Sequence, residues 1–325
     1  MLMPITMADL DAATEVVRQH MPSTPQYEWP ILNDAAGSRV VVKHENHTPV
    51  GAFKVRGGLV YMERLVRERP QVVGVLSATR GNHGQSLAFA GNAYGKEVVI
   101  YVPHGNSIEK NAAMRALGAE VIEHGTDFQE AREESVRAAA ERGLEAVPPF
   151  HRDLVLGVAT YVRELFDGGG SLDTVYVPVG MGSGINAMIA VRDLLGLSTR
   201  IVGVVSSSAP ATQLSFAAGE VVTTEAAATF VDGVACRVPD ASSLAGMLAG
   251  ADRIIDVSDD ATAEAMRLIY RTTHNVAEPA GAIALAGVLS ESPAQRGDRC
   301  AFTLCGGNVD TDTLAEVLGG ATPAS

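Results

Sequence analysis

The chain has 325 residues, a length that suggests one large domain or two of modest size. Hydrophobic residues make up 46% and charged residues 19%, so a sizeable core can be buried, while the net charge of −13 argues against nucleic acid or an anionic membrane as a partner. The three cysteines, Cys236, Cys300 and Cys305, form no CxxC pair, which disfavours a disulfide framework or a zinc cluster and makes a cytoplasmic, reducing location the default expectation.

The predicted elements alternate between helices and short strands rich in β-branched residues. Thr6 and Asp9 form a capping box that predicts a helix to about Met21. Amphipathic or Ala-rich segments predict further helices at 82–94 and 127–142, and Gly168–Gly170 is predicted to be a loop. The predicted strands are 39–45, 72–77, 97–102, 119–123, 173–179, 200–206, 253–257 and 299–305. This alternation predicts an α/β fold with largely parallel strands, whose ligands bind at the carboxyl ends of the strands.

The first motif that can carry chemistry is Thr48-Pro-Val-Gly-Ala-Phe-Lys54-Val-Arg-Gly-Gly58. Lys54 follows a Gly/Pro loop and is expected to open a helix. The helix dipole disfavours an ammonium there, which favours a neutral, nucleophilic amine. The alternative is an ordinary surface lysine.

The second motif is Ser77-Ala-Thr-Arg80-Gly-Asn82-His83-Gly-Gln85, between a predicted strand and a predicted helix. Backbone amides and hydroxyl groups in such a turn can hold a carboxylate. The alternative is a plain connection in which Asn82 caps the helix.

The third motif, Val177-Pro-Val-Gly180-Met-Gly182-Ser-Gly184-Ile-Asn186, also joins a strand to a helix. Its glycines allow the backbone to approach a phosphate, and the helix N-terminus supplies free amides. A dinucleotide site is the competing interpretation. It requires the first strand–helix turn and a later acidic residue, where this chain has Ser206-Ser-Ser208, so it is disfavoured.

The fourth motif is Thr303-Leu-Cys305-Gly-Gly-Asn308-Val-Asp310, at the end of the last predicted strand. Read alone, it is a turn with a buried cysteine.

Together, the four motifs resemble the fold-type II pyridoxal-phosphate family of serine and threonine dehydratases and serine racemase, in family order from Lys43 to Asp310. The resemblance implies a tryptophan synthase β-like fold with two parallel-sheet αβα domains. Residues 1–71 plus 151–325 would form the large cofactor-binding domain, and 72–150 the small substrate-loop domain.

The resemblance also implies roles for individual residues. Lys54 resembles the lysine that carries the cofactor as a Schiff base and acts as the catalytic base. Cys305 resembles the neutral group against the pyridine nitrogen, which favours elimination over a long-lived carbanion. The other cofactor-binding residues implied are Phe53 beside the ring, Asn82 at the 3′ oxygen, and the phosphate cradle Gly180, Met181, Gly182, Ser183 and Gly184. The substrate-binding residues implied are Thr79, Arg80, Asn82, His83 and His151.

Two of these residues depart from the family pattern. Arg80 stands where racemases have a proton-shuttling serine, and a permanently charged arginine is a poor proton shuttle, so racemisation is disfavoured. Arg80 is instead a candidate for binding a substrate carboxylate or the cofactor phosphate. His151 stands where relatives tend to have Asn or Asp, and a solvated loop histidine is the alternative. The acidic ligands of a divalent-metal site are missing after residue 205, so no metal is expected. A monovalent cation held by backbone carbonyls stays open, and the resemblance places Glu278 near it.

The function implied by the resemblance is that of a carbon–oxygen lyase. It would convert a β-hydroxy-α-amino acid to a 2-oxo acid and ammonia, as a homodimer. Threonine and serine are the default substrates, and phenylserine, 3-hydroxyaspartate or a hydroxylated diamino acid are alternatives. β-Replacement on the same fold, a nicotinamide dehydrogenase and a non-catalytic binding module are the competing functions.

Overall fold

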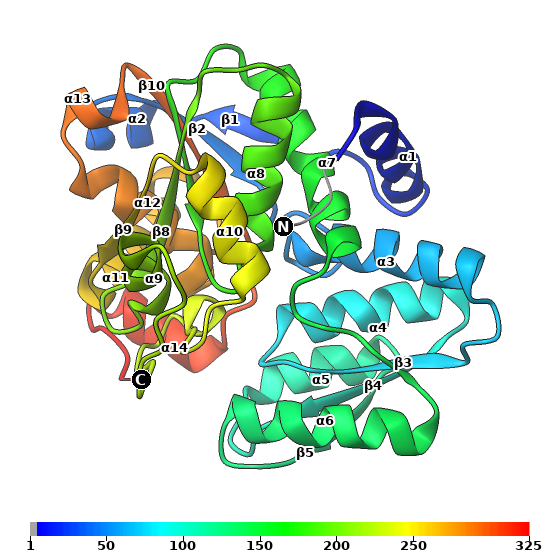
Figure 1. Ribbon diagram of the computed structural model, residues 1–325. Helices are drawn as coiled ribbons and strands as arrows, with labels where there is room; N and C mark the ends of the chain where they lie inside the picture. The colour runs from blue at the N-terminus through cyan, green and yellow to red at the C-terminus, as the bar shows by residue number, and fades with distance from the viewer. Residues whose placement is uncertain (1–4, 325) are drawn as a thin grey trace.

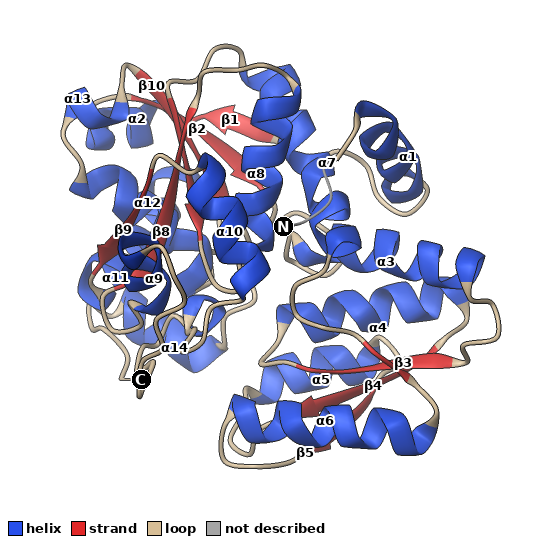
Figure 2. Ribbon diagram, viewed as in Figure 1, coloured by secondary structure: helices blue, strands red, loops and turns tan. Residues whose placement is uncertain are grey.

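The computed structural model describes residues 5–324. The chain forms two β-sheets with helices packed against them (Figures 1 and 2). The strands are β1 (Gln26–Glu28), β2 (Arg39–His44), β3 (Gly74–Ala78), β4 (Glu97–Val102), β5 (Glu120–Glu123), β6 (Glu145–Ala146), β7 (Thr174–Pro178), β8 (Arg200–Ser206), β9 (Arg253–Val257) and β10 (Arg299–Leu304). The helices of the first half are α1 (Met7–Arg18), α2 (Pro30–Ala36), α3 (Lys54–Glu68), α4 (Asn82–Tyr94), α5 (Ile108–Ala116), α6 (Phe128–Arg142) and α7 (Arg152–Gly169). The helices of the second half are α8 (Ser183–Leu194), α9 (Ala211–Ala218), the 3-10 helix η1 (Asp232–Val234), α10 (Ala241–Gly250), α11 (Asp259–Thr273), α12 (Pro279–Ser290), α13 (Pro293–Arg296) and α14 (Thr311–Leu318).

The larger sheet has the strand order β1-β2-β10-β7-β8-β9, and every neighbouring pair except β1–β2 is parallel. Side chains alternate between its faces, as the pleat requires. Val41 and Ala301 pack in the core cluster that contains residues of α7 and α8. Val42 and Phe302 pack in the opposite cluster, which contains residues of α11 and α12. The predicted α/β fold with parallel strands is therefore confirmed for this half.

The smaller sheet has the order β5-β4-β3-β6 and is entirely parallel. One face is covered by α3, α4 and part of α1, and the other by α6. Val55 and Leu59 of α3 belong to the same core cluster as Val75 and Ile100 of this sheet. All four strands lie between the predicted domain limits of 72 and 150, and those limits themselves stay a prediction.

Most predicted elements are confirmed to within a few residues. The capping box of Thr6 and Asp9 starts α1, and Lys54 is the first residue of α3. The predicted loop at Gly168–Gly170 is wrong in part, because α7 continues through Gly169. Strands β1 and β6 were not predicted, since three and two residues are too few to show an alternating pattern.

The first turn of α5 connects the two sheet units at the carboxyl ends of their strands. Ser107 Oγ donates to Asp310 Oδ1 at 2.5 Å, and the backbone N–H of Thr311 donates to Glu109 Oε1 at 2.9 Å. Lys110 forms a short ion pair with Asp232 of η1. We use the name junction for these contacts and for the four motifs near them. The contact residues are Ser107, Glu109, Lys110, Asp232, Asp310 and Thr311.

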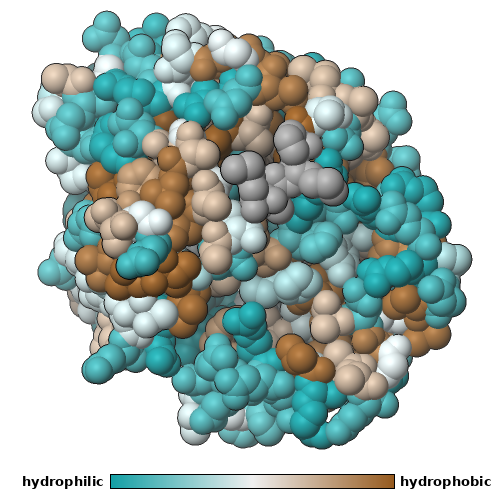
Figure 3. All heavy atoms as spheres, in the orientation of Figure 1, coloured by the Kyte–Doolittle hydropathy of each residue, from teal (hydrophilic) through white to brown (hydrophobic). Residues whose placement is uncertain are grey.

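The surface is mostly polar over the smaller unit in the view of Figure 3, whereas apolar residues gather around α9 and α10. Leu214 and Leu248 on these two helices are exposed. Within residues 5–324, no helix is both long and apolar enough to cross a membrane.

A buried histidine makes the stability of the larger unit depend on pH. His44 is fully buried, and Trp29 Nε1 donates to His44 Nε2 at 3.1 Å, so the proton of the neutral ring lies on Nδ1. Burial, with smaller effects from His47 and Lys43, lowers the pKa of His44 to about 4. An unfolded chain binds this proton at about pH 6.5. Stability is therefore lost as the pH falls from that value to about 4.

We expect acidification from pH 7 to 4 to cost on the order of 3 kcal/mol through His44 alone. Urea unfolding followed by the fluorescence of Trp29, the only tryptophan, measures this loss. The variant His44→Gln keeps an acceptor for Trp29 and cannot be protonated in this range. An equal acid-induced loss in wild type and variant would contradict the assignment to His44.

Candidate active site

Lys54 is held against the segment that contains Cys305. Ala52 forms an antiparallel bridge with Gly306, and the backbone N–H of Phe53 donates to the carbonyl of Cys305 at 2.9 Å. Thr48 Oγ1 closes the preceding loop by bonding both the N–H and the carbonyl of Ala52, each at 2.9 Å. The first and fourth motifs therefore meet, although some 250 residues separate them in the chain.

The surroundings of Lys54 favour its neutral amine. Burial lowers the pKa of Lys54, and the opposing influence of Cys305 and Glu278 does not restore it. Its Nζ lies 4.9 Å from the centre of the Phe53 ring. The start of α3 adds the positive end of a helix dipole, which also disfavours an ammonium. A neutral amine is the form that attacks carbonyl carbon and accepts a proton.

Cys305 contributes a neutral thiol to the surroundings of Lys54. It is buried at the end of β10, and burial raises the pKa of its thiol well above the usual value. Glu278 raises it further, whereas Lys54 acts in the opposite direction. A thiol that stays protonated at neutral pH can donate or accept a weak hydrogen bond without adding charge.

The second motif reaches the junction through Asn82, the first residue of α4. Asn82 Nδ2 donates to Glu278 Oε1 at 2.7 Å, and Asn82 Oδ1 accepts from Asn308 Nδ2 at 2.9 Å. Thr79 Oγ1 accepts the N–H of Gly81 at 3.0 Å and so shapes the turn before the helix. The second and fourth motifs are therefore also in contact.

His83 and Arg80 flank this turn and differ in their surroundings. His83 is buried, and burial, with a smaller effect of Lys54, lowers its pKa to about 3, so its ring is neutral. Its Nε2 has no hydrogen-bond partner within the described chain. Arg80 is exposed and makes no hydrogen bond or ion pair with residues 5–324. Both are therefore available to a ligand.

The third motif forms a tight turn before α8. Gly182 has φ +90°, and a Cβ built there would lie 1.9 Å from Ser243 Oγ, so the position requires glycine. Asn186 Nδ2 holds the turn by donating to the Gly182 carbonyl and to Ser243. No side chain caps the N-terminus of α8, which leaves its first amides free for an anion. A Cβ at Gly184 would lie 3.9 Å from the Phe53 ring, so this turn borders the first motif.

The comparisons with known proteins agree with this arrangement. The family described as pyridoxal-phosphate dependent enzymes matches residues 17–306. The chain belongs to this family.

Relatives and solved structures of the family cover nearly the whole chain. The biosynthetic L-threonine dehydratase of Salmonella typhimurium is 33% identical over 90% of this chain, which spans 58% of that relative's length. The L-threo-3-hydroxyaspartate ammonia-lyase of Saccharomyces cerevisiae is 28% identical over 98% of both chains. The processed threonine deaminase isoform 2 of Solanum lycopersicum superposes with a TM-score of 0.88 at 27% identity, covering 98% of this chain and 95% of that one. The predicted family and fold are confirmed.

The groups at the junction fit the cofactor after which the family is named. Lys54 offers an amine whose neutral form is favoured by burial, and the uncapped start of α8 offers amides for a phosphate. A side chain at Gly182 would clash with Ser243, so glycine preserves the shape of this turn. Cys305 adds a neutral thiol, and Asn82 has an amide N–H besides the one it gives to Glu278.

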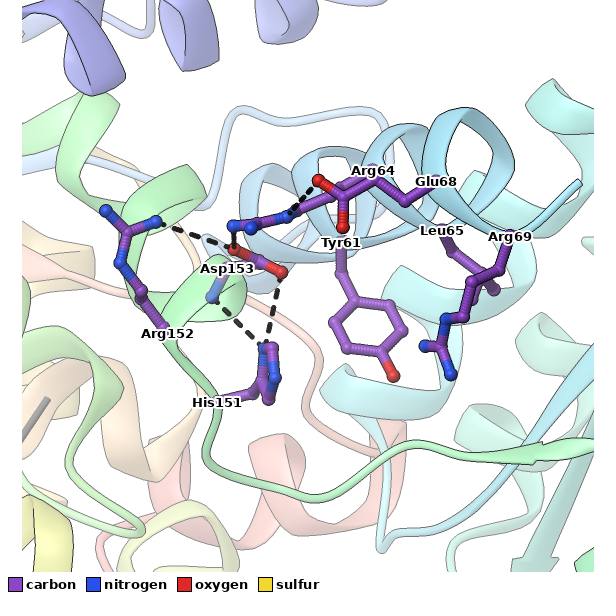
Figure 4. A pocket seen from close by; sticks show the side chains of 8 residues that line it. All are labelled: Tyr61, Arg64, Leu65, Glu68, Arg69, His151, Arg152 and Asp153. Carbon is purple, nitrogen blue, oxygen red and sulfur yellow. Dashed lines mark hydrogen bonds and ion pairs between the residues drawn. The ribbon is translucent and has the colours of Figure 1, made fainter. Parts of the chain in front are cut away.

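His151, in contrast, lies in a surface pocket whose lining includes no residue of the four motifs (Figure 4). Its Nδ1 accepts the N–H of Asp153, which caps α7, and its ring packs edge-on against Tyr61 at 5.2 Å. The pocket has a volume of about 310 Å³ and is lined by Tyr61, Arg64, Leu65, Glu68, Arg69, His151, Arg152 and Asp153. The contact of His151 with substrate stays a prediction.

Two members of the junction were absent from the predicted site residues. Glu278 is buried beside Asn82, and Lys110 is buried beside Asp232. Neither belongs to one of the four motifs. Glu278 was expected only near a possible monovalent cation, and Lys110 is identified by the folded arrangement alone. Within the described chain, no group of three or more His, Cys, Asp or Glu side chains is placed to hold a metal ion.

Proposed function

We propose that the chain is a pyridoxal-phosphate-dependent ammonia-lyase that dehydrates a β-hydroxy-α-amino acid to a 2-oxo acid and ammonia. The observation that carries the proposal is the contact between the Lys54 segment and Cys305, where burial lowers the pKa of the amine and keeps the thiol neutral. The named dehydratases and ammonia-lyases among the relatives support it. A homodimer, a cytoplasmic location and a monovalent cation stay predictions.

In this proposal each motif has one task. Bound pyridoxal phosphate supplies an electron sink for the bonds to the substrate α-carbon. Lys54 holds the cofactor and accepts the α-proton, and the amides from Gly180 to Gly184 hold the phosphate. Cys305 would keep the environment of the ring nitrogen neutral, which favours rapid loss of the β-hydroxyl over a long-lived carbanion.

The second motif, Ser77–Gln85, which we call the substrate loop, is proposed to hold the α-carboxylate. Thr79 supplies a hydroxyl, and the start of α4 supplies amides and the positive end of a dipole. His83 is neutral and can donate or accept a hydrogen bond without titrating near pH 7.

L-Threonine and L-serine are the proposed substrates, and L-threo-3-hydroxyaspartate is the second candidate. Arg80 favours the second candidate, because it is an exposed cation of the substrate loop and has no partner in the described chain. A planar guanidinium binds a carboxylate through two parallel hydrogen bonds. The yeast relative that acts on 3-hydroxyaspartate matches this chain over 98% of both lengths.

The test is a substrate panel on the purified protein loaded with pyridoxal phosphate. Threonine, serine, phenylserine and L-threo-3-hydroxyaspartate are each assayed for 2-oxo acid and ammonia. Equal amounts of both products from one substrate support the lyase. A visible cofactor band without either product would overturn it and leave β-replacement, tested with an added thiol.

Arg80→Ser separates the two substrate candidates. If the substrate carries a second carboxylate, the variant should lower kcat/KM for it roughly 10- to 100-fold, the equivalent of a hydrogen bond to a charged group. Arg132→Ser, at another exposed arginine, is the matched control. An unchanged preference in Arg80→Ser would exclude a second carboxylate bound by Arg80.

The glycine turn gives a prediction that needs no turnover. We expect Gly182→Ala to weaken pyridoxal phosphate binding at least tenfold, because the new methyl group would displace Ser243 and strain the backbone at φ +90°. Cofactor titration followed by visible absorption measures the change. Gly196→Ala, beyond the other end of α8, has φ +64° and no atom within 4 Å, so it tests backbone strain alone. Equal effects of both variants would contradict a phosphate site at Gly182.

A further inference from the structure

Glu278 is a buried acid that the proposed function does not use. It precedes α12 and is only 1% exposed. Its backbone N–H donates to the carbonyl of Gly306 at 3.0 Å, and a Cβ at Gly306 would lie 2.2 Å from its Oε1. Its carboxyl group is therefore packed against the residue that follows Cys305, close to the Lys54 segment.

The two oxygens of Glu278 have different surroundings. Oε1 accepts from Asn82 Nδ2 at 2.7 Å, whereas Oε2 is buried without a partner in the described chain. Because Asn82 Oδ1 accepts from Asn308, the amide of Asn82 is oriented with its Nδ2 toward Glu278. A buried, unpaired carboxylate oxygen is costly, and a proton on Oε2 removes the cost without breaking the bond at Oε1.

The charges that face Glu278 come from four segments. Lys110 of α5 and Asp232 of η1 form an ion pair with each other, and Lys54 and Cys305 are also close enough to interact electrostatically with Glu278. The stem of Lys110 packs against the substrate loop, where a Cβ at Gly81 would lie 2.6 Å from its Cδ. Lys110 therefore brings a charge from the smaller unit to an acid of the larger one.

We propose that Glu278 is a positioning residue that orients the amide of Asn82 through Oε1 and takes up or releases one proton at Oε2, with Lys110 and Asp232 setting the balance. The consequence for catalysis rests on the proposed function. An ionised Glu278 stabilises the ammonium form of Lys54, and a protonated Glu278 favours the free amine that the lyase requires. The protonation states of Glu278 and Lys54 are therefore coupled. The pair carries no charge when Glu278 is protonated and Lys54 is a free amine.

The electrostatics support this assignment. Burial raises the pKa of Glu278 to about 7, while Lys110 lowers it and Asp232 raises it. The hydrogen bond from Asn82 and the charge of Lys54 also lower it. Both protonation states are therefore populated near neutral pH.

The first experiment needs neither cofactor nor turnover. Infrared spectra of the cofactor-free protein from pH 5 to 9 are compared with those of Glu278→Gln, which keeps an oxygen acceptor for Asn82 and loses the carboxyl group. We expect a protonated-carboxyl band in the wild type, absent from the variant, that disappears with a midpoint near pH 7. A wild-type spectrum identical to that of the variant above pH 5 would overturn the proposal.

Two further variants test the roles of Lys110 and Asp232. Lys110→Met should move the midpoint upward by about one pH unit, and Asp232→Asn should move it downward. Lys96→Met removes a lysine whose ammonium, among residues 5–324, bonds only the carbonyls of Pro70 and Val72, and it should leave the midpoint unchanged. Shifts of the same sign in Lys110→Met and Asp232→Asn would contradict control by these charges.

Stability provides an independent measurement. A raised pKa in the folded state stabilises the fold below the unfolded pKa, and this contribution is lost as the pH rises through about 7. The urea midpoint of the wild type should therefore fall relative to that of Glu278→Gln between pH 5 and 8. A constant difference would overturn the titration. Failure of the substrate panel leaves these results standing, so the two proposals fail separately.

Discussion

Lys54→Ala is expected to lower kcat/KM for release of the 2-oxo acid by at least about 10⁴-fold and to remove the visible cofactor band. One side chain would perform two tasks, covalent attachment of the cofactor and acceptance of the α-proton, so both are lost together. The fold should survive. Lys54 makes no side-chain hydrogen bond with the described residues, and alanine is compatible with the first turn of α3.

The control for this variant is Lys96→Ala, which removes a surface lysine that bonds backbone carbonyls. Absorption spectra and product assays with excess pyridoxal phosphate are recorded for both variants. If Lys54→Ala still binds the cofactor with an unchanged visible band, the assignment of Lys54 is wrong. If the band disappears and turnover persists, only the role as base is wrong.

The four motifs could be found from the sequence because each is continuous and lies at the carboxyl end of a strand or next to one. Their glycines, prolines and polar residues are unusual within short segments, so the pattern is visible without tertiary contacts. What the sequence could not supply was the contact between distant motifs, such as the bond from Phe53 N–H to the Cys305 carbonyl. That contact depends on the pairing of β10 beside β2.

The contact of Glu278 with Asn82 and the burial of Lys110 escaped prediction for a different reason. A glutamate before Pro279 reads as an ordinary helix start, and Ile108-Glu-Lys110 reads as a solvated first turn. Their function would arise only from burial at the junction, which local sequence does not encode. His151 was proposed from the resemblance to the family. The structure places it in the pocket beside Tyr61, and its contact with substrate stays a prediction.

A buried ionic network around Arg56, two residues after Lys54, leads to the second prediction of a large effect, a loss of stability. Arg56, in the first turn of α3, donates to Glu45 through Nε at 2.8 Å and to Glu164 through Nη1 at 2.9 Å. Arg56 and Glu45 are both fully buried, and Lys43 adds a bond to Glu164 at 2.7 Å. Burial alone would raise the pKa of Glu164, but Arg56 and Lys43 hold it below its usual value.

We expect Arg56→Met to lower the free energy of unfolding by about 3–5 kcal/mol, the usual cost of leaving buried charges without a partner. Methionine has a similar length, so the lost charge and hydrogen bonds, rather than a cavity, dominate the effect. Arg67→Met on the same helix removes an exposed ion pair with Glu63 and should cost less than about 1 kcal/mol. Urea denaturation of both variants measures the contrast.

The pH dependence of this loss identifies its cause. Without Arg56, the carboxyl group of Glu164 remains in a buried setting, where it can escape the cost of its charge by binding a proton. Protonation becomes easier as the pH falls, so Arg56→Met should be less destabilising at pH 5 than at pH 8. A loss that is the same at both values would mean that packing, not charge, is what Arg56 contributes. Because Arg56 lies two residues after Lys54, a charge-driven loss would show that the stability of the fold depends on charges in the first turn of α3.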